Sequence, residues 1–310
     1  MHKGENMEIK KITMIGQGAL GILFGKKITD AVGKENMRYL ADQSRIDRYQ
    51  KSGVTCNGEL CDFGYVTPEE KGDPADLVIF AVKGPTLAEA IRNAKYQIGS
   101  RTILLSLMNG ISSEAEIGKV YGTDNLLYCV AQGMDATRAG NTLIYTKAGE
   151  LIFGEMDGSR SENVKAVAAL FDKSGISYEI PQDMNRIMWK KFMMNVGVNQ
   201  AVTAFESSYG GVQIEGEPRR TMQEAMREVI TIANLKGIDL NESDIDYWMN
   251  VLAHFGKELK PSMAQDADAK RKTEVGLFAG TVIRIADQLG VQVPVNRWLY
   301  QRIHEIESKY

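Results

Sequence analysis

The chain has 310 residues, of which 44% are hydrophobic and 25% charged, a composition typical of a soluble globular protein with two domains. The 37 basic and 40 acidic residues leave a net charge of −3, which argues against a broad nucleic-acid-binding surface. Three cysteines without a CxxC spacing argue against a disulfide framework or a metal cluster. The same cysteines suit a reducing compartment, so we expect a cytoplasmic protein without a metal site. No apolar h-region follows the N-terminus and no apolar run reaches the ~18 residues of a membrane helix, so we expect neither a signal peptide nor a membrane span.

The first predicted element is a strand over residues 12–15. It leads into a glycine-rich turn and then into helical apolar spacing, the order typical of a dinucleotide-binding site. Gly16 would allow a tight turn, Gly18 would let the backbone approach a pyrophosphate, and Gly21 would let the helix pack closely on the strand. The helix N-terminus offers free N–H groups to the phosphates. We therefore expect the cofactor to be bound by Gly16, Gln17, Gly18, Ala19, Leu20 and Gly21.

The second predicted strand, residues 36–41, ends at Asp42, which lies 21 positions after Gly21. An acidic residue there usually accepts a hydrogen bond from the ribose 2′-hydroxyl and repels a 2′-phosphate, which favours NAD over NADP. Arg45 and Arg48 follow, and either could bind a 2′-phosphate or simply carry surface charge. The residues alone leave the choice of cofactor open.

Polar side chains follow the next two predicted parallel strands, 77–82 and 102–108. In an open α/β sheet ligands bind beyond the carboxyl ends of the strands, so Lys83 and Asn109 are candidate ligand contacts. The alternatives are a solvated loop lysine and a turn-forming Asn-Gly pair. The other elements expected in this domain are a hairpin at 53–61, a strand at 126–131, an antiparallel pair 142–145 and 151–154 completing the sheet, a helix at 164–171 and a strand at 177–180.

Pro181 marks the predicted domain boundary, because no comparable strand pattern follows it. The sequence thus predicts a Rossmann-type domain over residues 1–181 and an all-helical domain over 182–310, α/β plus all-α in class. The expected helices are one through Lys191 and others at about 218–236, 243–259, 268–289 and 295–308, with Gly210-Gly211, Gly237 and Gly290 at helix ends.

Lys191, Asn195 and Asn199 stand at i, i+4 and i+8, so an α-helix would project them from one face. Apolar residues surround them, and an unsatisfied polar group on such a helix costs roughly 1–3 kcal/mol. The row is therefore a candidate substrate site. Alternatively, Lys191 extends to water and the two asparagines bond to neighbouring backbone.

A second candidate segment begins after Pro261, which ends the preceding helix. Ser262 is expected in a non-helical approach, and Glu274 on the long helix that follows, at the edge of a packed surface.

Together, the glycine turn, Lys83, Asn109-Gly110, the Lys191 row and the segment from Ser262 to Glu274 resemble the ketopantoate reductase family, in order along nearly the whole chain. The resemblance implies that Lys191 is the general acid and that the active site lies in the cleft between the domains. It further implies that Glu274 lies by the nicotinamide ribose and orients the site. By the same resemblance, the substrate is bound by Asn195, Asn199, Ser262 and Asn109, and the cofactor is lined by Lys83, Asn109, Ala136 and Glu274. Arg45 is a further candidate cofactor contact because of its position after Asp42.

The implied activity is reduction of ketopantoate to pantoate with NADPH, a step of pantothenate and coenzyme A biosynthesis. Two residues depart from the family pattern. Asp42 replaces the usual basic residue and allows NADH, and Tyr209 stands near a usual substrate-binding asparagine. The alternatives are an NAD-dependent 2-hydroxyacid dehydrogenase for other branched 2-oxo acids and a dinucleotide-sensing binding protein. The expected partner is a small 2-oxo acid, neither nucleic acid nor membrane. A homodimer is one candidate assembly.

Overall fold

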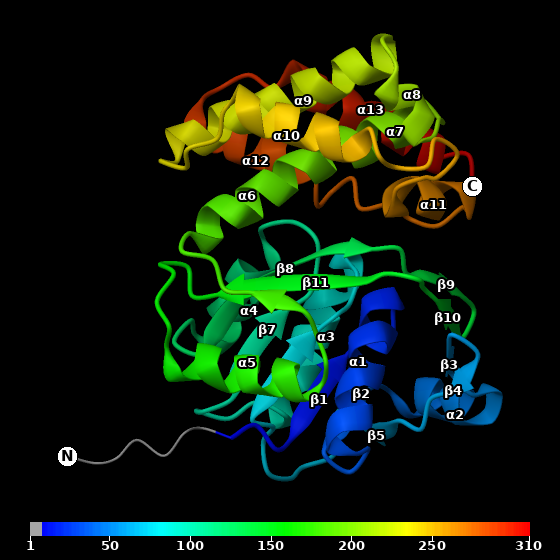
Figure 1. Ribbon diagram of the computed structural model, residues 1–310, viewed down its shortest axis with the longest axis vertical. Coiled ribbons are helices and arrows are strands. Elements are labelled where there is room, and N and C mark those ends of the chain that lie inside the picture. Colours follow the sequence, from blue (N-terminus) through cyan, green and yellow to red (C-terminus); the bar gives the residue numbers. More distant parts are fainter. Residues whose placement is uncertain (1–7) are drawn as a thin grey trace. The chain divides into compact units, whose positions relative to one another are not determined.

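A computed structural model describes residues 8–310 (Figure 1). The chain folds into two compact units. The first comprises the residues up to Asn109 together with Ser113–Met184. The second comprises the tripeptide Gly110–Ser112 together with Asn185–Tyr310. The tripeptide belongs to the second unit because Ile111 packs against that unit's core. Pro181, the predicted boundary, lies shortly before the division at Met184.

The first unit is built on an eight-stranded sheet in the order β12-β11-β8-β7-β6-β1-β2-β5. All neighbouring strands are parallel except β8 and β11. The order turns back at β1, between β2 and β6, which is the topological switch point where α/β sheets bind ligands. The strands are β1 (Ile12–Ile15), β2 (Met37–Leu40), β5 (Gly64–Val66), β6 (Leu77–Phe80), β7 (Ile103–Ser106), β8 (Leu126–Met134), β11 (Ala148–Gly154) and β12 (Tyr178–Glu179).

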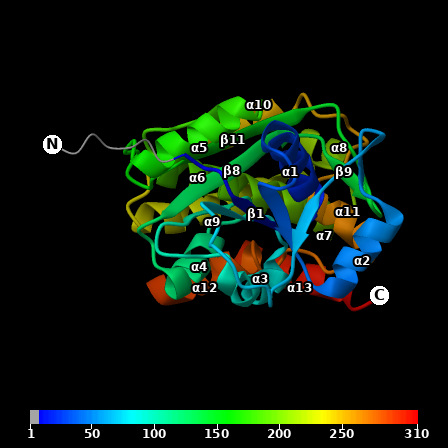
Figure 2. The same cartoon turned by 90° about the horizontal axis from the view of Figure 1, so that it is seen from below.

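Helices cover both faces of this sheet (Figure 2). The core on one face joins Ile12 and Met14 of β1 to side chains of α1 (Ala19–Val32) and α5 (Glu162–Lys173). The core on the other face includes Ile15 and side chains of α3 (Leu87–Asn93) and α4 (Ser113–Tyr121). Successive strand residues point to opposite faces, and all four residues of β1 are buried, so this strand is covered on both sides. The remaining helices of this unit are α2 (Gln43–Ser52), η1 (Gly84–Thr86) and η2 (Ala94–Tyr96).

The predicted hairpin is confirmed as β3 (Thr55–Cys56) and β4 (Glu59–Leu60), with Asn57 and Gly58 both at positive φ, 50° and 84°. It forms a small second sheet with β9 (Thr137–Ala139) and β10 (Thr142–Ile144).

The predicted antiparallel pair of residues 142–145 with 151–154 is wrong. β10 pairs with β9 and β3, whereas β11 pairs with β8, from Ala148 opposite Met134 to Gly154 opposite Tyr128. The physical reason is that β8 is nine residues long and offers β11 a full-length edge, which a three-residue partner does not.

The second unit is built from helices packed around one core. The predicted helix ends at Gly237 and Gly290 are confirmed, since both glycines follow a helix at positive φ. Gly210 and Gly211 instead lie inside a short helix, which corrects their prediction as helix ends. The elements are α6 (Met184–Met194), η3 (Asn195–Asn199), α7 (Gln200–Ala204), α8 (Tyr209–Gln213), α9 (Glu217–Leu235), α10 (Glu242–Leu252), α11 (Ser262–Asp268), α12 (Ala279–Leu289) and α13 (Pro294–Glu307).

Two predicted helices are shorter or divided. The helix expected over 243–259 ends at Leu252. The long helix expected over 268–289 is wrong: α11 ends at Asp268, α12 begins at Ala279, and residues between them form a loop. Lys270 interrupts the helix with a φ of 52°, and the Arg271 N–H donates to the Asp266 carbonyl, which closes the end of α11.

Candidate functional site

The glycine turn between β1 and α1 has the geometry that its sequence predicted. Gly16 has a φ of 103°, and a Cβ on it would lie 2.6 Å from the Ala81 carbonyl oxygen. A Cβ on Gly21 would lie 2.1 Å from the Gly16 oxygen, so α1 packs closely on the turn. A Cβ on Gly18, the N-cap of α1, would lie 3.8 Å from the Ala81 carbonyl oxygen, which is an ordinary van der Waals distance. Since packing does not require glycine at 18, a backbone approach to a ligand is the remaining reason for it.

A pocket opens in the first unit beyond the carboxyl ends of β1, β2 and β6. Gln17 lines it with a buried Oε1 that has no hydrogen-bond partner among residues 8–310, while its Nε2 donates to the Tyr65 hydroxyl at 3.2 Å. A ligand hydroxyl is the kind of group that would supply the missing donor. The other lining residues are Ile15, Gly16, Tyr39, Leu40, Ala41, Asp42, Arg45, Tyr49, Val82, Thr86, Glu89, Ala90 and Asn93.

Asp42 caps α2 at the edge of this pocket. Its carboxylate accepts hydrogen bonds from the Ser44 hydroxyl at 2.6 Å and the Arg45 N–H at 2.9 Å, and these bonds lower the pKa of Asp42. The Arg45 side chain pairs with the same carboxylate at 3.2 Å. The edge of the pocket therefore carries a carboxylate that is ionised at neutral pH, and the Arg45 side chain partly neutralises its charge.

The other first-unit candidates lie after strands. Lys83 is an exposed residue at the start of η1, Asn109 is half-buried after β7, and Ala136 is half-buried between β8 and β9. Ala19 and Leu20 open α1.

The segment around Asn109 rests on a buried chain of hydroxyls. The hydroxyls of Ser106 and Ser113 lie 2.9 Å apart, and Ser113 donates to the Glu114 carboxylate at 2.8 Å. The Ser106 hydroxyl also accepts from the Met108 N–H at 3.3 Å. Burial raises the pKa of Glu114 to about 7.

In the second unit, α6 passes into one π-helical turn, η3, rather than continuing as the regular α-helix expected. A wider turn displaces the usual i→i−4 backbone bonds, and such turns are frequent at functional sites. Gln200 supports this one with its fully buried side chain: Nε2 donates to the Val196 carbonyl at 2.8 Å and Oε1 accepts from the Ala279 N–H at 3.0 Å. Gly197 allows α9 to pack closely, since a Cβ there would lie 2.6 Å from Met226.

The π turn brings the two asparagines together. Asn199 Oδ1 accepts from the Met263 N–H at 3.4 Å, and Asn199 Nδ2 donates to Asn195 Oδ1 at 3.2 Å. Because a peptide N–H can only donate, the first bond fixes the orientation of Asn199, and the second then fixes that of Asn195. The Nδ2 of Asn195 is left buried without a partner among the described residues. We call this sequence of bonds the amide relay. It presents one N–H₂ group to an oxygen acceptor.

Lys191 lies at the end of α6, one helical turn before Asn195. It is half-buried, and burial lowers the pKa of its ammonium group to about 8. An amine with this pKa remains mostly protonated at neutral pH and gives up its proton far more readily than an exposed lysine.

Ser262 is the exposed first residue of α11, not part of a non-helical approach, since Pro261 already has the extended backbone of an N-cap. Glu274 is buried in the loop after α11, not on a helix. The loop is held by Glu307 of α13, whose carboxylate accepts from the Thr273 N–H and hydroxyl, both at 2.7 Å. Sequence reasoning missed Glu307 because its partner lies 34 residues away.

Among residues 8–310, no group of His, Cys, Asp and Glu has the arrangement of a metal site. In the same part of the chain, no helix combines the length and apolar character needed to cross a membrane.

Comparisons with known proteins cover both units. Residues 12–158 match the family described as "Ketopantoate reductase PanE/ApbA", and residues 183–307 match "Ketopantoate reductase PanE/ApbA C terminal". The 2-dehydropantoate 2-reductase of Halobacterium salinarum is 27% identical over 296 residues, which are 93% of this chain and 96% of that relative.

Solved structures share the fold. A D-mandelate dehydrogenase with NADH and anilino(oxo)acetate aligns with a TM-score of 0.86 at 20% identity, covering 96% of this chain and 99% of that one. A PanE/ApbA family ketopantoate reductase from Ralstonia eutropha aligns with a TM-score of 0.82 at 22% identity and the same coverage. The chain therefore belongs to the ketopantoate reductase family and is an oxidoreductase.

Proposed function

We propose that this protein reduces the keto group of ketopantoate to give pantoate, the reductive step of pantothenate and coenzyme A biosynthesis, with NADPH or NADH as the reductant. The observation that carries the proposal is the buried, unpartnered Nδ2 of Asn195, one helical turn from a lysine of lowered pKa. A 2-oxo acid offers the oxygen acceptor that this donor lacks and the carbonyl that this acid would protonate.

The cofactor, when bound, supplies a hydride to the carbonyl carbon. In this proposal the Lys191 ammonium donates its proton to the carbonyl oxygen, so that the oxygen does not carry a full negative charge as the alcohol forms. The pKa of about 8 suits this role, because the acid is charged near neutral pH yet releases its proton easily. The lysine regains a proton from solvent after product release.

The amide relay would orient the substrate. Asn195 would donate from Nδ2 to a carboxylate or hydroxyl oxygen, and such charge-assisted bonds contribute about 1.5–3 kcal/mol. We assign Ser262, Asn109 and Asn199 to the same binding task on the strength of the family resemblance, and Glu274 to orienting the site beside the nicotinamide ribose.

The glycine turn and the pocket beyond β1 and β2 would hold the cofactor. The α1 N-terminus would bind the pyrophosphate and Gln17 a ribose hydroxyl. Family resemblance implies NADPH, with Lys83, Asn109 and Ala136 lining it. The Asp42 carboxylate favours NADH instead, because its charge opposes a 2′-phosphate.

A second candidate function is that of an NAD-dependent 2-hydroxyacid dehydrogenase for other branched 2-oxo acids. Two observations favour it: the charge of Asp42, and Tyr209, a half-buried aromatic residue that packs edge-on against Phe255 at 4.9 Å near the family's usual asparagine position. One neighbour in structure is itself described with NADH.

A steady-state panel tests the two functions. Ketopantoate, 2-oxoisovalerate and an aromatic 2-oxo acid are each reduced with NADPH and with NADH, and kcat/KM is measured from nicotinamide absorbance. We expect ketopantoate to exceed the others by about tenfold or more, roughly 1.4 kcal/mol of transition-state preference. A tenfold advantage for another acid with NADH would replace the first function by the second. Tight cofactor binding without turnover would contradict both.

We also propose a homodimer, because a ketopantoate reductase from Staphylococcus aureus with the same fold is described as dimeric, and light scattering tests it. A cytoplasmic location is proposed from the three free cysteines, Cys56, Cys61 and Cys129, which suit a reducing compartment. Fractionation of cells tests the location.

A further inference from the structure

We propose that Trp248 is a positioning residue for Lys191: its indole holds the peptide group from which Lys191 extends, and its ring keeps water from the ammonium. This inference rests on the proposed role of Lys191 as proton donor. Trp248 lies on α10, carries no recognisable sequence motif and is 57 positions from Lys191 (248 − 191).

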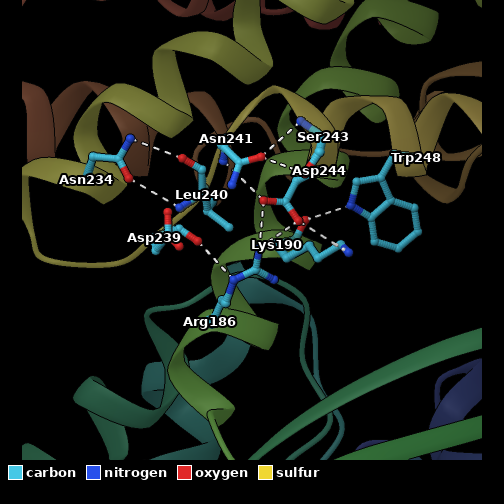
Figure 3. Close-up of polar contacts among 9 residues, drawn as sticks. All are labelled: Arg186, Lys190, Asn234, Asp239, Leu240, Asn241, Ser243, Asp244 and Trp248. Atoms are coloured by element: carbon cyan, nitrogen blue, oxygen red, sulfur yellow. Dashed lines mark hydrogen bonds and ion pairs between the residues drawn. The ribbon is translucent and has the colours of Figure 1, made fainter.

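The helices α6 and α10 are joined by a set of polar contacts that we call the α6–α10 clamp (Figure 3). Arg186 donates from one nitrogen to both carboxylate oxygens of Asp244 at 2.9 Å, and from Nε to the Asp239 carbonyl at 2.9 Å. Lys190 Nζ lies 3.3 Å from the same carboxylate. Asp244 is only 3% exposed, so these contacts form in partly dry surroundings where ion pairs are strong.

Asp244 is also fixed from its own helix. Its side chain accepts from the Asn241 N–H at 3.1 Å, and together with Asn241 it forms a capping box at the start of α10. The clamp therefore ties the well-defined N-terminus of α10 to the middle of α6.

Trp248 completes the clamp one turn further along α10. Its Nε1–H donates to the Lys190 carbonyl at 3.0 Å (Figure 3). That carbonyl belongs to the peptide plane that leads into Lys191, so the bond fixes the direction in which the lysine side chain leaves the helix. An error of about 1 Å in the placement of a reacting group can cost roughly 10²-fold in rate.

The Trp248 ring has a second effect. It is 7% exposed, and its centroid lies 5.7 Å from Lys191 Nζ. At this distance, close to the ~6 Å limit of cation–π attraction, the ring stabilises the charge weakly. Its removal of water is the larger effect, in agreement with burial as the cause of the lowered pKa of Lys191. Among the charged groups of the clamp, Arg186 and Lys190 each form an ion pair with Asp244.

The test uses the full chain and three variants. Trp248→Ala removes both effects, and Trp248→Phe removes the indole N–H but keeps a smaller aromatic ring. Tyr247→Ala is the matched control, because this neighbouring ring lies 3.7 Å from Lys190 Nζ rather than over Lys191, and it is 47% exposed.

The pKa of Lys191 is read without turnover, from the pH dependence of its acylation by acetic anhydride, quantified by mass spectrometry of the Lys191 peptide. We expect the midpoint to rise by a pH unit or more, from about 8 towards 10.5, in Trp248→Ala, and to stay unchanged in Tyr247→Ala and Trp248→Phe. The alkaline limb of kcat/KM should shift in the same way. An unchanged midpoint in Trp248→Ala overturns the inferred water exclusion.

The hydrogen bond is tested by Trp248→Phe, which keeps an aromatic ring at this position and disturbs the core less than Trp248→Ala does. We expect kcat to fall by about three- to tenfold, as the loss of one net hydrogen bond predicts, with little change in the KM of either ligand. A kcat within twofold of wild type overturns the positioning role. If instead Lys191→Ala keeps full turnover while Trp248→Ala still shifts the acylation midpoint, the proposed function has failed and the contact stands.

Discussion

The two units position their candidate site residues in different ways. In the first, the glycine turn lies within six consecutive residues, and the positive φ of Gly16 and the 2.1 Å approach of a Gly21 Cβ to the Gly16 oxygen both arise inside it. In the second, the relay that presents Asn195 is set by Met263 and Gln200, and Gln200 in turn bonds to Asn296, 96 positions away. The glycine turn of the first unit is thus fixed mainly by local chain geometry, and the amide relay of the second unit by tertiary packing. We expect distant substitutions to disturb the amide relay more than they disturb the glycine turn.

Among the candidate residues of the second unit, Lys191→Ala should have the largest effect. We expect kcat to fall by about 10²–10⁴, the usual loss on removing a general acid, measured by nicotinamide absorbance. The wild-type kcat/KM should also fall above about pH 8, as Lys191 loses its proton. Lys190→Ala is the control, since that side chain pairs with Asp244 instead, and it should lose less than about tenfold. Equal losses in both variants would remove the distinction between the two lysines.

The amide relay predicts a graded series. Asn195→Ala removes the unpartnered donor, and kcat/KM should fall by about 10–150-fold, equivalent to 1.5–3 kcal/mol. Asn199→Asp keeps the acceptor for the Met263 N–H but loses the donor that orients Asn195, so its loss should be smaller, about tenfold. If Asn199→Asp is the more damaging change, Asn195 is not the end of the relay.

The first unit offers a stability test at Glu114. Burial raises its pKa from 4.5 to about 7, so the native state holds its proton more tightly than the unfolded chain does. This stabilisation is full below about pH 4.5 and is lost as the pH rises through 7. Glu114→Gln, which stays uncharged, should therefore match the wild type near pH 4.5 and exceed it by about 2–3 kcal/mol at pH 8. Urea unfolding at both pH values measures the difference in unfolding free energy between the variant and the wild type. If this difference is the same at the two pH values, the buried-charge explanation is refuted.

The smallest expected effect concerns the cofactor. Asp42→Asn retains an N-cap for α2 but removes the negative charge. The ratio of kcat/KM for NADPH over NADH should rise by about tenfold, roughly 1.4 kcal/mol. Arg48→Ala serves as the control, because that side chain stacks on Tyr49 at 5.2 Å and is not among the pocket residues. A ratio that rises equally in both variants would assign the selectivity to general charge rather than to Asp42.

The sequence predicted those features whose causes are local. The strand at Ile12–Ile15, the hairpin at Asn57-Gly58 and the helix end at Gly290 all follow from a few neighbouring residues, and the structure confirms them. Family resemblance indicated the candidate residues of both units. The pairing of β11 with β8 could not be predicted, because either partner satisfied the alternating pattern of the strands.

The remaining errors lie where distant contacts override local preference. Residues 268–289 have helical composition, yet the Thr273 N–H donates to the Glu307 carboxylate, and this bond stabilises a loop there. The π turn depends on Gln200, whose partners are on α12 and α13. The only sequence pattern that indicates the clamp is the capping pattern Asn241-x-x-Asp244, and no motif includes Trp248.

The tripeptide Gly110–Ser112 makes the two units inseparable as genetic modules. It belongs to the helical unit, although the chain on both sides of it belongs to the first, so the backbone passes between the units at three places. A chain cut at Met184 would leave Ile111 without the core that buries it, and the released helical fragment would lack the side chain that fills that place. Neither unit should therefore fold when it is transferred to another protein by a single cut, and recombination between family members should succeed only when all three junctions are exchanged together.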